Sequence, residues 1–159
     1  MRYTMHMNPW IALPLWIALC FLPSLTGIFA QPGTWYGELD KPWFTPPNWL
    51  FGPAWTTLYV LMGLSAWLVW REAGFAGAKV ALGLFLAQLL LNAAWSPVFF
   101  GLHRMGWALV VIVMMGAAIL ATMAAFYPHS KVAAGLLVPY LGWVSFATAL
   151  NVALWRLNG

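Results

Sequence analysis

The chain has 159 residues, of which 64% are hydrophobic and only 6% are charged. Soluble domains carry about a quarter charged residues, so this composition excludes a water-soluble globular protein and predicts an integral, all-α membrane protein. The formal net charge of +4 comes from scattered single residues, which excludes a nucleic-acid partner and is typical of contacts with lipid headgroups. A single cysteine, Cys20, excludes a disulfide framework.

Five apolar segments are long enough to cross a bilayer, which needs about 20 residues per helix. We expect the spans at about 9–30, 48–70, 79–101, 106–126 and 132–156. The first segment is too long for a secretory signal and has no clear cleavage site after it, so we expect it to be retained. The sequence therefore predicts a five-transmembrane-helix bundle in a single domain, residues 1–159. The basic residues divide almost evenly between the two sides, which leaves the orientation open.

The connector between the first two spans, residues 31–47, is longer than the 2–8 residues usual between bundle helices. Its four prolines restrict the backbone, and its aromatic side chains carry apolar area that needs a surface to cover. They are Trp35, Tyr36, Trp43 and Phe44. A structured loop that closes one mouth of the bundle and an aromatic belt at the membrane interface explain this composition equally well.

No Asp, Glu, Lys, Arg or His falls in the middle of an expected span. Proton relays and ion pathways use such intramembrane groups, so their absence argues against a carboxylate-coupled pump. The three histidines, His6, His103 and His129, lie at segment ends, where they cannot serve as inward haem ligands. The inventory also offers no metal site and no conventional acid–base pair.

One face in each of two expected spans combines aromatic rings with neutral hydrogen-bonding groups. The third span contributes Gln88, Asn92, Trp95 and Ser96, and the fifth contributes Tyr140, Trp143, Ala147 and Asn151. Such a surface suits a flat, largely apolar ligand. The alternative is that the amides only join helices. On another face of the third span, Gly83 and Ala87 form a small-xxx-small pair that predicts a homodimer contact.

Five stretches of the chain resemble the translocator-protein family, also called peripheral-type benzodiazepine receptors and, in bacteria, tryptophan-rich sensory proteins. They are WYGELDKPWFTPP, GPAWTTLYVLMG, NAAWSPVFFG, RMGWAL and PYLGWVSFATALNVALWR. The match runs from about residue 20 to residue 156 and preserves order, spacing and span count.

The resemblance implies a five-helix bundle whose first loop closes over a cavity. Family members bind porphyrins such as protoporphyrin IX, drug-like ligands and, in animals, cholesterol, so porphyrin is expected here as a ligand that is not covalently attached. The implied pocket residues are Trp55, Asn92, Trp95, Trp107, Trp143, Ala147 and Leu150, with Trp35 and Trp43 in the loop. The expected ligand-binding set also includes Tyr140 and Asn151. Gly83 and Ala87 match a proposed dimer motif of the family.

Three functions remain open at this stage. The first is a tetrapyrrole-binding sensory protein, the second a light-dependent porphyrin-degrading enzyme with Trp55 and Trp143 as candidate catalytic residues, and the third a porphyrin or lipid transporter. The family's sterol motif requires a tyrosine where this chain has Val152, so cholesterol binding is not expected. That departure and the N-terminal extension indicate a bacterial cell envelope.

Overall fold

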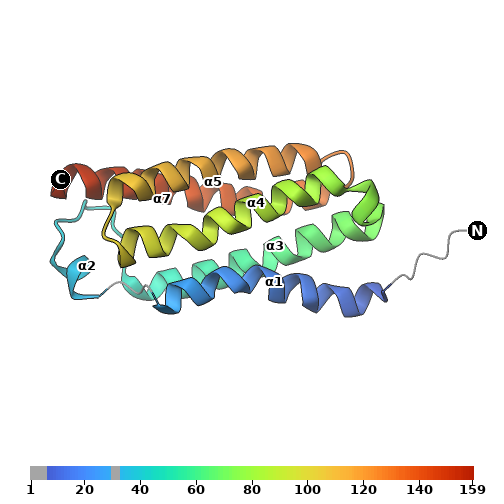
Figure 1. Ribbon diagram of the computed structural model, residues 1–159, viewed down its shortest axis with the longest axis horizontal. Helices are drawn as coiled ribbons and strands as arrows, with labels where there is room; N and C mark the ends of the chain where they lie inside the picture. Colours follow the sequence, from blue (N-terminus) through green and yellow to red (C-terminus); the bar gives the residue numbers. More distant parts are fainter. Residues whose placement is uncertain (1–6, 30–32) are drawn as a thin grey trace, which may run out of the picture.

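The computed structural model describes residues 7–29 and 33–159, and in these ranges the chain is helical without strands, as the sequence predicts (Figure 1). The helices are α1 (Pro9–Phe29), α2 (Thr34–Glu38), α3 (Asn48–Gly77), α4 (Lys79–Ser96), the π-helix η1 (Pro97–Gly101), α5 (Met105–Phe126), α6 (Lys131–Leu136) and α7 (Val138–Asn158). The long helices run side by side along the long axis of the molecule. The short helix α2 lies at the end where α7 terminates (Figure 1).

Four helical stretches are long and apolar enough to cross a membrane, namely Pro9–Gly27, Lys79–Gly101, Met105–Phe126 and Lys131–Asn158. The predicted span at 48–70 does form a helix, α3, but its tryptophans, its threonines and Pro53 lower its mean hydropathy. The sequence predicts five spans, and the described residues contain four stretches of this length and hydropathy. The protein is an integral membrane protein that crosses the bilayer several times.

Two observed helical regions end or break at other residues than predicted, and a glycine or a proline lies near each difference. The helix predicted to end near residue 70 continues to Gly77, and its irregular turn lies at Gly74, whose φ of 70° suits a glycine. The predicted span at 132–156 is two helices, α6 and α7, which meet at Leu137. Pro139 lies in the first turn of α7, where its missing N–H costs no helical hydrogen bond.

The end of α4 is widened into a π-turn. The amide of Leu102 donates to the carbonyl oxygen of Pro97 at 2.8 Å, a bond between residues five positions apart. π-turns are frequent at functional sites. Here the turn carries Phe99, which is buried, and Phe100, which is half-buried, toward the same end of the bundle as α2.

Helices α1 and α3 approach most closely where Gly63 faces Ile17. A Cβ added to Gly63 would lie 2.6 Å from the Cα of Ile17 and 2.8 Å from its nitrogen. Because these contacts are with backbone atoms, no side-chain rotation can relieve them. Gly63 therefore sets the separation of the two helices at this crossing.

We expect Gly63→Ala to separate α1 from α3 and to lower the melting temperature by about 3–10 °C, because overpacking costs about 1–3 kcal/mol. The matched control is Gly116→Ala in α5, where an added Cβ meets no atom within 4 Å and the better helix propensity of alanine favours stability. Thermal unfolding of the two purified variants in the same detergent gives the comparison. Equal melting temperatures would show that the crossing is not tightly packed.

Candidate functional site

A cavity of about 610 Å³ lies inside the end of the bundle that α2 covers. This volume is in the range of small-molecule sites, about 300–1,000 Å³. Residues from α1, α2, α3, α4, η1, α5 and α7 line it, and none of the lining residues that the structure describes carries a charge. The cavity can therefore hold an apolar molecule and offers no ion pair to it.

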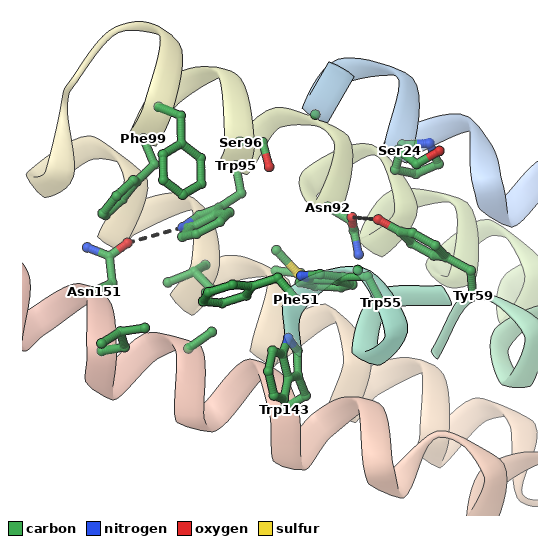
Figure 2. A pocket seen from close by; sticks show the side chains of 18 of the residues that line it. Ser24, Phe51, Trp55, Tyr59, Asn92, Trp95, Ser96, Phe99, Trp143 and Asn151 are labelled. Carbon is green, nitrogen blue, oxygen red and sulfur yellow. Dashed lines mark hydrogen bonds between the residues drawn. The ribbon is translucent and has the colours of Figure 1, made fainter. Parts of the chain in front are cut away.

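The tryptophan Trp55 stands at the centre of one aromatic wall. Its ring stacks on Tyr59 at 5.6 Å between centroids and meets Trp143 edge-on at 6.4 Å, with an interplanar angle of 86°. Phe51, one turn before Trp55, meets the ring of Trp143 at 6.0 Å. Figure 2 shows the indole of Trp143 projecting from α7 toward Phe51 and Trp55. This arrangement offers both ring faces and ring edges, which flat aromatic ligands can contact.

A second aromatic group, centred on Trp95, is held in place by hydrogen bonds. The indole Nε1 of Trp95 donates to Asn151 Oδ1 at 3.1 Å (Figure 2), and Asn151 Nδ2 donates to the carbonyl oxygen of Met105 at 2.9 Å. The ring of Trp95 also stacks on Phe99 at 5.1 Å. Each end of the Asn151 amide makes one of these hydrogen bonds, so the amide positions Trp95 while also lining the cavity.

A buried hydrogen-bond network joins α3, α4 and α7 beside the cavity. Tyr140 donates its hydroxyl to Gln88 Oε1 at 2.7 Å and accepts from Asn92 Nδ2 at 2.8 Å. Asn92 Oδ1 accepts from the hydroxyl of Tyr59 at 3.2 Å. The interpretation that these amides join helices is therefore correct for Gln88 and Asn92. Asn92 also lines the cavity.

Two buried donors beside the cavity, the indole nitrogen of Trp143 and the hydroxyl of Tyr36, have no partner among the described residues. Both residues line the cavity. Burial raises the pKa of the Tyr36 hydroxyl, so it stays protonated and can donate. Leaving a buried donor unpaired costs about 1–3 kcal/mol, which a ligand with a hydrogen-bond acceptor could recover.

Residues 33–47, here called the lid segment, cover the end of the cavity; residues 31 and 32 of the predicted loop lie outside the described residues. Tyr36 is buried in the lid segment and meets Phe100 at 5.5 Å. Trp35 stacks on His103 at 4.1 Å with an interplanar angle of 5°. Asn158 bonds to the backbone of Asp40 twice, accepting from its N–H and donating to its carbonyl oxygen, each at 2.9 Å. The lid segment is therefore fastened to both η1 and the end of α7.

Seven of the predicted ligand-binding residues line the cavity: Trp55, Asn92, Trp95, Trp143, Ala147, Leu150 and Asn151. Tyr140 lies behind the wall in the hydrogen-bond network. The other three predicted ligand-binding residues do not line the cavity. Trp35 packs on η1, Trp43 is 95% exposed at the tip of the lid segment, and Trp107 is 68% exposed on the outer face of α5. Ligand contacts by these three stay predictions that the cavity lining does not support.

Other lining residues were not predicted. Phe51 and Tyr59 flank Trp55 at intervals of four on α3, so the same spacing rule that selected the stripes on α4 and α7 would have found them. Phe99 and Phe100 also line the cavity. Their direction depends on the π-turn, which no spacing rule for an α-helix would predict.

The predicted dimer pair lies apart from the cavity. Gly83 and Ala87 are exposed on the outer face of α4, and an added Cβ at Gly83 would meet no atom within 4 Å. A second helix could therefore approach α4 closely at this position. The homodimer itself stays a prediction.

Removing the hydroxyl in Tyr140→Phe would leave Gln88 Oε1 and Asn92 Nδ2 without their partner, and each unpaired buried group costs about 1–3 kcal/mol. We expect a lower melting temperature for Tyr140→Phe than for the wild type. Tyr127→Phe is the matched control, because Tyr127 is exposed. Thermal unfolding in detergent measures both. A melting temperature for Tyr140→Phe equal to that of the control would contradict a structural role for the network.

Comparison with known proteins agrees with this architecture. The chain matches the TspO/MBR family over residues 10–156. It is 50% identical over 141 residues to the translocator protein of Homo sapiens, covering 87% of this chain and 83% of that protein. It is 44% identical over 149 residues to the tryptophan-rich sensory protein of Cereibacter sphaeroides, with 94% and 92% covered. The match to the tryptophan-rich protein TspO of Archaeoglobus fulgidus is 50% over 125 residues, with 79% and 80% covered. The chain therefore belongs to the TspO/MBR family.

Proposed function

We propose that this protein binds planar tetrapyrroles, such as porphyrins, inside the bilayer and that occupancy of the cavity has a sensory or regulatory role. The observation that carries the proposal is the uncharged cavity of about 610 Å³, whose lining includes the indoles of Trp55 and Trp143. Each favourable aromatic contact is worth about 0.5–1.5 kcal/mol beyond the area it buries. The sensory role follows the name of the relative from Cereibacter sphaeroides.

The side chains around the cavity favour a metal-free porphyrin. No histidine or cysteine is among the described lining residues, and the one thioether there is Met115, whose sulfur lies 3.5 Å from the Tyr140 hydroxyl oxygen. Tyrosine can also ligate a haem iron, but burial keeps the Tyr36 hydroxyl protonated. The unpaired N–H of Trp143 and O–H of Tyr36 suit acceptor groups on the ring or on its substituents.

The wider organisation follows from the same family membership. We propose that α3 is a fifth span beside the four more apolar stretches, because it is 30 residues long and lies alongside α1. We also propose that two copies meet at the face of α4 that carries Gly83 and Ala87, in a bacterial cell envelope.

A second candidate is light-dependent oxidation of the bound porphyrin. In such a step the excited porphyrin would give an electron to dioxygen, leaving superoxide and an oxidised ring, and Trp55 and Trp143 both line the cavity where that ring would lie. The discriminating measurement is the bleaching rate under light. Equal rates with the protein and with detergent alone would leave only the binding function.

The double variant Trp55→Phe/Trp143→Phe should bind protoporphyrin about tenfold more weakly than the wild type, because it loses indole area and the Trp143 donor. The control is Trp43→Phe/Trp107→Phe, which also removes two tryptophans but at exposed positions away from the cavity. Quenching of tryptophan fluorescence by protoporphyrin gives the dissociation constants. Equal affinity in the two double variants would refute binding in this cavity.

A further inference from the structure

The cavity reaches the surface at the side of the bundle, between α1 and α3. Its lining includes Asn48, Gly52 and Thr56 of α3, which are all exposed, and Ser24 and Gly27 of α1, which are half-buried. A residue that both lines a cavity and is exposed lies at an opening. In a membrane protein, this side of the bundle faces lipid.

The opening follows from the register in which α1 and α3 pack against each other. Ile17 faces Gly63, and one turn further along α1 the ring of Phe21 meets Tyr59 at 5.3 Å. Residue numbers therefore rise along α1 as they fall along α3. The same register brings Ser24 opposite Thr56 and Gly27 opposite Gly52. The seam holds bulky side chains up to the pair of Phe21 and Tyr59, and the lining residues that the structure describes beyond it, Ser24, Gly27, Gly52 and Thr56, are small.

The small residues leave space between the two helices. An added Cβ at Gly27 or at Gly52 would meet no atom of the described residues within 4 Å. The hydroxyl of Ser24 donates to the carbonyl oxygen of Phe21, and the hydroxyl of Thr56 donates to that of Gly52 at 2.8 Å. Because both hydroxyls are bonded to their own helices, they offer no free donor that would hold water or stop an apolar ligand.

Two other sides of the cavity are fastened in the described residues. The hydroxyl of Thr26 lies between two carbonyl oxygens, that of Pro23 on its own helix at 2.7 Å and that of Ala93 on α4 at 2.8 Å. At the end of the bundle, the bonds of Asn158 to Asp40 and the stack of Trp35 on His103 fasten the lid segment. A ligand that used this end would have to break all of these contacts.

We propose that the gap bounded by Ser24, Gly27, Gly52 and Thr56 is a lateral portal through which the flat apolar ligand enters the cavity from the bilayer while the lid segment stays closed. The occupant follows from the proposed function, on which this inference rests. A ligand of this kind partitions into hydrocarbon, so a lateral route meets it where it is concentrated.

Plugging the portal should slow both the entry and the exit of the ligand. In Gly27→Leu/Gly52→Leu, we expect the association and dissociation rate constants for protoporphyrin each to fall by about tenfold or more. Gly116→Leu, on α5 with open space around it, is the control. Stopped-flow fluorescence in lipid nanodiscs measures both rates. Unchanged rates in the plugged variant would overturn the portal.

A second variant tests whether the ligand enters through the lid segment. Asn158→Ala removes both bonds to Asp40, and we expect it to leave the association rate within about twofold of wild type. The control is Leu157→Ala, which alters the neighbouring exposed side chain. Association accelerated about tenfold by Asn158→Ala alone would assign entry to the lid segment and overturn the lateral portal.

A second measurement does not depend on porphyrin binding. In a Cys20→Ala background, Ser96→Cys places a single thiol on the cavity wall. A long-chain N-alkylmaleimide dissolved in the bilayer should label this thiol, and Gly27→Leu/Gly52→Leu should slow labelling by about tenfold or more. Equal labelling rates would overturn the portal. Wild-type protein that fails to bind porphyrin would refute the proposed function, while the labelling result would still decide the portal.

Discussion

The structure depends on neutral polar groups that satisfy one another inside the membrane. In hydrocarbon no water is available to pair a polar side chain, and here Tyr59, Asn92, Tyr140 and Gln88 pair across α3, α4 and α7. Asn151 does the same between Trp95 and the backbone of Met105. These bonds brace the helices around a hollow. They also leave mainly aromatic faces to line it, so the cavity is open without exposing many unsatisfied groups.

The cavity owes its shape to unequal packing between α1 and α3. Where Gly63 meets Ile17 the helices touch at backbone level, and where Gly27 and Gly52 occupy the seam they leave space. Glycine thus serves two opposite purposes in one helix pair. At one crossing it permits contact, and at the other it prevents the side-chain packing that would close the bundle. The lid segment completes the enclosure through Tyr36, which reaches the cavity from outside the spans.

Much of this arrangement could be predicted from sequence. The lack of mid-span charges and the stripes on α4 and α7 identified an uncharged aromatic site, and seven predicted residues line the cavity. The family resemblance implied Trp43 and Trp107, and neither lines the cavity; an indole at a membrane interface has the same sequence signature as one in a pocket. The π-turn at Pro97–Gly101 and the break at Leu137 depart from the regular 3.6-residue period of an α-helix. For that reason, neither Phe99 nor the boundary between α6 and α7 could be read from helical periodicity.

The central claim is that an uncharged, indole-lined cavity beneath the lid segment recognises flat ring systems. A structure of the protein with bound protoporphyrin in nanodiscs tests it most directly. The account predicts the macrocycle in contact with Trp55 and Trp143, beneath Tyr36. A macrocycle bound on the outer surface beside Trp107, with the cavity unchanged, would contradict it.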